Sequence, residues 1–176
     1  DLMYGLPYQT IEQWETTLKR ALDLGPPHIS MYALTLEGGT PMEQWVKNGQ
    51  LPEPSADLAA DMYIKAQGMF GRSGYAHYEI SNWALPGFES HHNLVYWQNE
   101  SYLGVGPGAH SYLQHHRFSN LKPPREYVQK LKEPLAVHGA ENKAAIESMP
   151  VVAEIEHIDT QLEMAETMIL GLRLDQ

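Results

Sequence analysis

The chain has 176 residues, of which 43% are hydrophobic and 19% charged, a composition typical of a soluble globular protein large enough to bury a core. Its 12 Lys and Arg residues against 22 Asp and Glu residues give a net charge of −10. This balance argues against a nucleic-acid partner, because such affinity depends on cationic side chains that neutralise phosphates. The lack of cysteine excludes disulfides, a thiolate nucleophile and cysteine-ligated zinc or iron–sulfur clusters within these residues.

No apolar run approaches the roughly 20 residues that a membrane-spanning helix needs, and no basic segment followed by an apolar one opens the chain. We therefore expect a cytoplasmic protein without a membrane span. The chain begins at Asp1 within an apolar run and stops at Gln176 directly after a helical pattern. Both ends suggest a segment of a longer protein.

The first part of the chain predicts a strand, a helix and a second strand. Residues 1–6 are mostly apolar, and Thr10 offers an N-cap for a helix that ends before Pro26. The run 28–36 is rich in Ile, Met, Tyr and Leu, which is typical of a strand buried on both faces. A strand, helix and strand in this order favour a parallel sheet and an α/β fold.

Ser55 then opens a long predicted helix, and residues 75–80 predict another strand. From 81 to 120 no helical periodicity is visible, and we expect loops and short strands there.

Two further helices are predicted at 125–131, where a pair of prolines precedes the first turn, and at 160–172. Between them, residues 134–150 contain few large apolar side chains and predict an exposed linker.

Histidines are concentrated in the middle of the chain, which raises the question of a metal site. The six that fall close together are His77, His91, His92, His110, His115 and His116. None has the His-x-x-x-His spacing of zinc hydrolases, so a zinc site is weakly supported. One or two axial ligands to a heme iron fit better, because a single imidazole in an aromatic pocket is sufficient. For His115, His116, His138 and His157 we expect structural or solvent-exposed roles.

The glycine-rich stretch 104–109 resembles a nucleotide-binding fingerprint only superficially, because it contains Pro107 and no helix is predicted after it. Glycine lacks a Cβ, so a close approach of the backbone to another strand or to a flat ligand explains the stretch better.

The segment 91–97 combines two imidazoles, an amide and two large aromatic rings. Read as a strand, it places Asn93 and Trp97 on one face and His92 and Tyr96 on the other. Such an array suits a flat aromatic ligand held by stacking and an imidazole nitrogen. An aromatic-rich sheet face without a ligand is the alternative that the residues leave open.

Several segments resemble the oxygen-independent coproporphyrinogen III oxidase family of radical S-adenosylmethionine (SAM) proteins. They are residues 1–7, 28–34, 37–41, 74–75, 77–82 and 86–87. The resemblance implies that residues 1–120 are the C-terminal part of a radical SAM barrel, a partial TIM barrel with trailing short strands. Residues 121–159 would be a helix and linker, and residues 160–176 the start of a helical, HemN-type C-terminal domain.

The family has an oxidase branch, which acts in porphyrin biosynthesis, and a HemW-like branch of heme chaperones. The His-Asn-x-x-Tyr-Trp motif of the second branch stands here as His92, Asn93, Tyr96 and Trp97. The resemblance therefore implies heme binding, with His92 as candidate iron ligand and Tyr96 and Trp97 as pocket walls, and heme transfer to acceptor hemoproteins. Coproporphyrinogen III oxidase activity is the alternative, and a pure interaction module is a third.

The resemblance also implies SAM and a [4Fe-4S] cluster in the complete protein. Asp1 matches the family's barrel aspartate that contacts SAM, and Ala33 matches a position whose backbone lies against it. The cluster's cysteine motif lies upstream in the family and is absent here, so we expect this segment to perform no radical chemistry by itself. We also expect the isolated segment to be unstable or to self-associate, and exposed aromatic loops are compatible with a homodimer.

Overall fold

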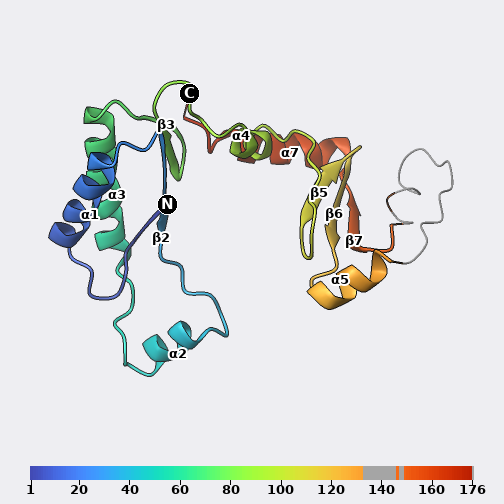
Figure 1. Ribbon diagram of the computed structural model, residues 1–176, viewed down its shortest axis with the longest axis horizontal. Coiled ribbons are helices and arrows are strands. Elements are labelled where there is room, and N and C mark those ends of the chain that lie inside the picture. The colour runs from blue at the N-terminus through green and yellow to red at the C-terminus, as the bar shows by residue number, and fades with distance from the viewer. Residues whose placement is uncertain (133–145, 147–148, 176) are drawn as a thin grey trace. The chain divides into compact units, whose positions relative to one another are not determined.

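The computed structural model describes residues 1–132, 146 and 149–175. The chain divides into two compact units (Figure 1). The first is Asp1–Ser90 together with the segment from Leu174, and the second is His91–Arg173. Each unit is described by itself.

The first unit contains a four-stranded sheet and three helices. Its elements are β1 (Leu2–Tyr4), α1 (Ile11–Asp23), β2 (His28–Ala33), α2 (Pro41–Lys47), α3 (Ala56–Arg72), β3 (Ala76–Glu79) and β4 (Asn82–Ala84). The strand order is β1-β2-β4-β3, with β1 and β2 parallel and the other neighbours antiparallel. The expected strand, helix and parallel strand are confirmed, whereas β4 was not predicted.

Local capping explains where the helices of this unit begin. The Thr10 hydroxyl accepts a hydrogen bond from the Gln13 backbone N–H, and the Gln13 side chain accepts one from the Thr10 N–H. This capping box satisfies two backbone donors that the first helical turn leaves free. Ser55 caps α3 through the Leu58 N–H. Both predicted caps are confirmed.

The core of the first unit lies between the sheet and the helices α1 and α3, which lie side by side (Figure 1). Trp14 and Phe70 are completely buried, and Met31 contributes from β2. The Trp14 indole N–H donates to the Met62 carbonyl oxygen over 2.9 Å, so the polar atom of this buried side chain is satisfied.

The other face of β1 and β2 carries exposed side chains within the described part of the chain. Tyr4 and Met31 are buried, while their strand neighbours Met3 and Tyr32 are 50% and 45% exposed. Alternate side chains along a strand point to opposite faces, so Met3 and Tyr32, which are register partners, share this other face. The prediction that 28–36 is buried on both faces is wrong for the described residues, because α1 and α3 pack on one face of the sheet while Tyr32 on the other face is 45% exposed.

The second unit contains a three-stranded antiparallel sheet with order β5-β6-β7. Its elements are α4 (His91–Trp97), β5 (His110–Leu113), β6 (His116–Asn120), α5 (Pro124–Lys130), β7 (Val152–His157) and α7 (Thr160–Gly171). The helices α5 and α7 confirm two predictions. The strand β7, which lies within the segment 121–159 expected to be a helix and linker, was not predicted, and it completes the sheet by pairing with β6.

The unit boundary after Ser90 falls inside the segment 1–120 that was expected to form one domain. The domain boundaries expected at 120 and 159 stay predictions for the longer protein. Most of the linker expected at 134–150 lies outside the described residues. Within the described ranges, no helix is long and apolar enough to cross a membrane.

The core of the first unit generates a stability prediction. Replacing the fully buried Leu18 by Ala removes apolar packing between α1 and α3, and we expect a loss of about 2–5 kcal/mol in the free energy of unfolding. The measurement is denaturant unfolding of the whole protein followed by tryptophan fluorescence. Leu24→Ala is the matched control because Leu24 is 85% exposed, and a loss equal to that of Leu18→Ala would contradict the assigned core.

Candidate functional site

The segment that carries the His-Asn-x-x-Tyr-Trp motif is a helix. Residues His91–Trp97 form α4, so the prediction of a strand at 91–97 is wrong. The helix ends as the N–H of Asn99 bonds to the Tyr96 carbonyl, with Asn99 in the left-handed region at φ 53°. In a helix, residues four apart share a face, so the motif forms two adjacent pairs, His92 with Tyr96 and Asn93 with Trp97.

His92 and Tyr96 are in direct contact on this helix. The Tyr96 hydroxyl lies 2.9 Å from Nε2 of His92, and the two rings meet edge to face with centroids 4.9 Å apart. His92 is exposed and Tyr96 half-buried. The predicted strand also placed the side chains of His92 and Tyr96 on one face. The observed helix brings them within hydrogen-bonding distance.

Trp97 is the inner residue of the motif. Its indole N–H is buried and has no hydrogen-bond partner within the described part of the chain. The guanidinium of Arg173 lies over the indole ring, 5.0 Å from its centroid, which is a cation–π contact. Trp97 therefore fastens α4 to the residues that follow α7, and it presents no free ring face to solvent on that side.

Tyr102 extends the aromatic group beyond the motif. Its ring meets the ring of Tyr96 edge to face, with centroids 4.6 Å apart. Its backbone forms a bridge with Tyr112 of β5, through hydrogen bonds of 2.8 and 2.9 Å. Burial raises the pKa of Tyr102 above its ordinary value, so the phenol stays neutral at physiological pH. Tyr102 thereby links α4 to the sheet.

A cavity of about 290 Å³ adjoins the motif on the Tyr96 side. It lies among α4, the segment that follows it, β6 and α7. Its lining residues are Tyr96, Asn99, Tyr102, Arg117, Glu166, Ile169 and Leu170.

An ion pair joins β6 to α7 at this cavity. Both terminal nitrogens of Arg117 donate to the carboxylate of Glu166, over 2.7 and 2.8 Å. This two-pronged contact lowers the pKa of Glu166 and raises that of Arg117, because each charge stabilises the other. The Arg117 guanidinium also lies 5.7 Å from the centroid of the Tyr112 ring.

A second polar contact joins the same sheet to α7. The Tyr112 hydroxyl donates to Oε1 of Glu163 over 2.9 Å. Burial, followed by this hydrogen bond to a carboxylate, raises the pKa of Tyr112 to about 12. Together with the Arg117 pair, it fixes one face of α7 against β5 and β6.

Sequence reasoning missed most of the cavity. Tyr102, Arg117 and Glu166 are far apart in sequence and meet only through the sheet and α7. The four-residue spacing of His92 and Tyr96 was the one available signal of a helix. The hydrogen bond from the Asn99 amide to the Thr167 hydroxyl, 3.0 Å long, likewise has no sequence signature.

Backbone polar groups of the glycine-rich stretch 104–109 have hydrogen-bond partners within the protein. A Cβ at Gly104 would collide with the carbonyl oxygen of His110, so the close approach expected there is between two backbone segments. The Gly104 N–H donates to the Ser111 hydroxyl over 2.9 Å, and the Gly106 N–H donates to the Tyr127 hydroxyl over 3.2 Å. These partners occupy groups that a phosphate cradle needs.

The six clustered histidines do not assemble into one site. His77 belongs to the first unit and stacks on Trp83, with ring centroids 4.5 Å apart. Nowhere in residues 1–132, 146 and 149–175 do three or more His, Asp and Glu side chains form a group that could hold a metal ion. His116 is buried, and its Nδ1 lies 2.7 Å from the Gln114 carbonyl, in keeping with the structural role expected for it.

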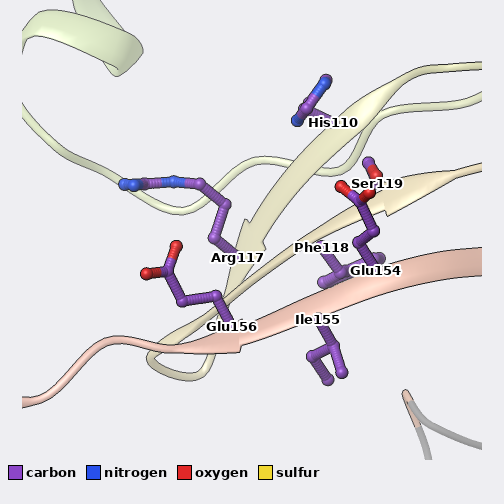
Figure 2. Close-up of a pocket in the computed structure, with 7 residues that line it drawn as sticks. All are labelled: His110, Arg117, Phe118, Ser119, Glu154, Ile155 and Glu156. Carbon is purple, nitrogen blue, oxygen red and sulfur yellow. The ribbon is translucent and has the colours of Figure 1, made fainter.

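A second, smaller cavity of about 180 Å³ lies on the sheet β5-β6-β7 (Figure 2). Figure 2 shows Arg117 and Glu156 extending from neighbouring strands, with Ile155 directed to the other side of the sheet. Because Arg117 is already bound to Glu166, and Glu154 and Glu156 are both acidic, this surface lacks a free cation for an anionic ligand. The cavity of about 290 Å³ is the better candidate because Tyr96, the partner of His92, lines it.

Asp1 and Ala33, the candidate SAM contacts, lie on neighbouring parallel strands. Asp1 directly precedes β1, and Ala33 is the last residue of β2 and the register partner of Tyr4. Both are exposed. Ala33 pairs with Tyr4, so along the strand direction it lies three residues beyond Asp1, at a rise of about 3.3 Å per residue. Ala33 follows Tyr32, so its side chain points to the opposite face from the exposed Met3 and Tyr32, and a ligand on that face would meet its backbone. The cysteine-free chain cannot supply the ligands of a [4Fe-4S] cluster.

Buried polar groups on the same sheet were not predicted. Glu79 is 1% exposed and accepts a hydrogen bond from the amide of Asn82, whose carbonyl oxygen has no partner within the described residues. The Tyr78 hydroxyl lies 2.7 Å from Nε2 of His28, and burial lowers the pKa of His28. These contacts hold β2, β3 and β4 together through side chains as well as backbone.

Comparison with a solved structure establishes the class of fold. The chain aligns over 98% of its length with the structure described as "Coproporphyrinogen III oxidase (HemN) from Escherichia coli is a Radical SAM enzyme", with a TM-score of 0.72 and 22% identity. It covers 39% of that chain. The fold is therefore the expected mixed α/β fold, a part of the radical SAM fold seen in HemN.

Curated relatives identify the branch. The chain is 40% identical to heme chaperone HemW of Lactococcus lactis and 35% identical to that of Bacillus subtilis, each over 98% of its length. It is also 47% identical over 110 residues to the mouse radical S-adenosyl methionine domain-containing protein 1, mitochondrial. No family model matches the chain. The chain is thus a HemW-like member of the coproporphyrinogen III oxidase-like radical SAM family, and it spans about two fifths of the length of its HemW relatives.

The Arg117–Glu166 pair generates a prediction about pH. The pKa of Glu166 is lowered in the folded state, so its stabilising contribution is present above the ordinary Glu pKa and is lost as pH falls through the lowered value. We expect Glu166→Gln to reduce the free energy of unfolding by up to about 1 kcal/mol at neutral pH and progressively less under acid conditions. Denaturant unfolding of the whole protein across pH measures this difference.

The control is Glu154→Gln, on the exposed side of β7, which should leave stability nearly unchanged at every pH. A Glu166→Gln effect that stays constant down to strongly acid pH would contradict the ion-pair interpretation.

Proposed function

We propose that the complete protein, of which this chain spans a part, binds heme at α4 and transfers it to acceptor hemoproteins. The observation that carries the proposal is the geometry of the motif. The exposed imidazole of His92 stands one helical turn from Tyr96, beside an aromatic-lined cavity. The names of the HemW relatives support the same function.

His92 fits the role of iron ligand on chemical grounds. A single exposed imidazole is sufficient for axial ligation, and a chaperone must release its heme, which an exposed site permits. The ring of Tyr96 supplies an aromatic wall beside that imidazole, while Trp97 holds the helix in place through Arg173. Asn93 lies one turn before Trp97, and we assign it to the same motif.

The hydroxyl of Tyr96 adds a condition to this role. An iron ion needs the lone pair of an imidazole nitrogen, and Nε2 of His92 already shares a hydrogen bond with Tyr96. Heme binding through Nε2 therefore breaks that hydrogen bond. The contact holds the imidazole in one orientation before heme arrives, and it competes with the iron afterwards.

The remaining assignments for the complete protein concern its cofactors and location. We propose that Asp1 and Ala33 form part of the SAM site, where bound SAM would provide the radical chemistry of this class. The [4Fe-4S] ligands would come from outside this chain. We also propose a cytoplasmic location, and the homodimer stays a prediction.

Coproporphyrinogen III oxidation is the second candidate function, because the fold is shared with HemN at a TM-score of 0.72. That likeness concerns the fold at 22% identity, while the HemW relatives are 35–40% identical over nearly the whole chain. The two functions differ in what they require of α4. A chaperone needs a persistent heme complex, and an oxidase needs turnover of a porphyrinogen.

The first prediction of the proposed function concerns His92. We expect the whole protein to bind hemin stoichiometrically and His92→Ala to weaken that binding at least about tenfold, because one iron–imidazole bond is lost. Hemin titration followed by absorbance measures the affinity, with a coproporphyrinogen turnover assay alongside. His91→Ala, a neighbouring exposed histidine, is the control. Turnover without stable heme binding would instead support the oxidase.

The second prediction concerns the Tyr96 hydroxyl. Tyr96→Phe keeps the aromatic ring and removes the hydrogen bond to Nε2, so we expect hemin affinity to rise by roughly two- to tenfold, the equivalent of one modest hydrogen bond. The same absorbance titration measures it. A loss of affinity as large as that of His92→Ala would mean that the hydroxyl itself supports the bound heme, contrary to the competition described above.

A further inference from the structure

We propose that the cavity of about 290 Å³ beside α4 receives the vinyl-bearing edge of heme, and that it discriminates against porphyrins that carry carboxylates at that edge. This inference rests on the proposed heme binding at His92. It adds a ligand preference: the site binds protoheme more tightly than iron porphyrins of the coproporphyrin type.

The cavity and the proposed ligand site share one residue. Tyr96 contributes to both, since its hydroxyl contacts His92 and its side chain lines the cavity. A volume of about 290 Å³ lies just below the range of roughly 300–1,000 Å³ for pockets that hold whole ligands, so the cavity can enclose part of a large flat ligand. The part nearest Tyr96 would be one edge of the porphyrin.

The walls of the cavity suit an apolar edge. The rings of Tyr96 and Tyr102 stand edge to face on one side, and Ile169 and Leu170 of α7 contribute aliphatic side chains. Ile169 is 61% exposed, which leaves a large apolar side chain without cover in this chain. Burying this side chain against vinyl groups removes apolar surface from water and favours binding.

The charges at the cavity disfavour an anionic edge. The positive charge of Arg117 is neutralised by the two hydrogen bonds to Glu166. A carboxylate that entered the cavity would meet the like charge of Glu166 while Arg117 was already occupied. Removing a carboxylate from water without a free partner is costly. Because both terminal nitrogens of Arg117 are used by Glu166, the cavity offers no free cation to a carboxylate, whereas it accepts hydrocarbon.

Porphyrin chemistry turns this preference into selectivity. Protoheme has vinyl groups along one edge and propionates along the opposite one, so it can insert its apolar edge and leave its carboxylates in water. In coproporphyrin III, propionates replace both vinyl groups, and no edge is free of carboxylates. Iron mesoporphyrin, which has ethyl groups in place of vinyls, should behave like protoheme.

The test uses absorbance titrations of the whole protein with hemin, iron mesoporphyrin and iron coproporphyrin III. We expect hemin and iron mesoporphyrin to bind with similar affinity and iron coproporphyrin III at least about tenfold more weakly. Glu166→Gln removes the carboxylate that occupies Arg117 and leaves Arg117 able to pair with a propionate, so iron coproporphyrin III should bind this variant more tightly than the wild type.

Two further variants probe the apolar wall. Ile169→Asp places a charge in the cavity and should weaken hemin binding at least about tenfold. Met164→Asp, on the same helix, 64% exposed and outside the cavity lining, is the matched control and should bind hemin normally. Circular dichroism and thermal unfolding of both variants establish that they are folded.

The outcomes separate the two proposals. Failure of the wild type to bind any of the three iron porphyrins would overturn the proposed function itself. Strong hemin binding that depends on His92, together with equal affinity for iron coproporphyrin III, would overturn only the selectivity and leave the heme-binding function standing. Normal hemin binding by Ile169→Asp would show that the cavity is not occupied by the porphyrin.

Discussion

The helical conformation of His91–Trp97 is the constraint on which the candidate site depends. Only a helix brings residues four apart close enough for the Tyr96 hydroxyl to reach Nε2 of His92 while Trp97 turns inward to Arg173. The same sequence in a strand would leave His92 and Tyr96 on one face but two pleats apart. Helical geometry therefore explains the four-residue spacing of His92 and Tyr96 without reference to a ligand.

The Arg117–Glu166 pair has a comparable role for the rest of the second unit. It joins β6 to α7, and the Tyr112–Glu163 hydrogen bond repeats that connection from β5. Because both contacts use one face of α7, the helix presents Ile169 and Leu170 to the cavity beside Tyr96. The Arg117–Glu166 pair, which fixes α7 at the cavity, also supplies the charged groups in the cavity lining.

Elements with a local physical signal could be predicted from the sequence. The side chains of Thr10 and Ser55 satisfy free backbone donors within a few residues, so α1 and α3 were found with their caps. By contrast, β4 depends on β2 as well as on the neighbouring β3, and β7 depends on β6; β2 and β6 are distant in sequence from the strands that they stabilise. Neither has a signal in its own few residues.

The candidate site shows the same division. The motif residues could be identified from the family resemblance. The four-residue spacing of His92 and Tyr96 is compatible with a helix, but the aromatic composition of the segment favoured a strand. Tyr102, Arg117, Glu166 and Ile169 could not be found, since the cavity exists only after the sheet, the helix and their ion pair have formed.

The two chemistries expected of the complete protein fall in different units of this chain. Asp1 and Ala33 belong to the first unit, and every residue of the α4 site and its cavity belongs to the second. The contacts that orient His92, from Tyr96 through Tyr102 to the sheet, are all made within that second unit. On physical grounds, then, the geometry at His92 forms without contacts to Asp1 or Ala33, and we expect substitutions to affect the proposed heme site and the proposed SAM site separately.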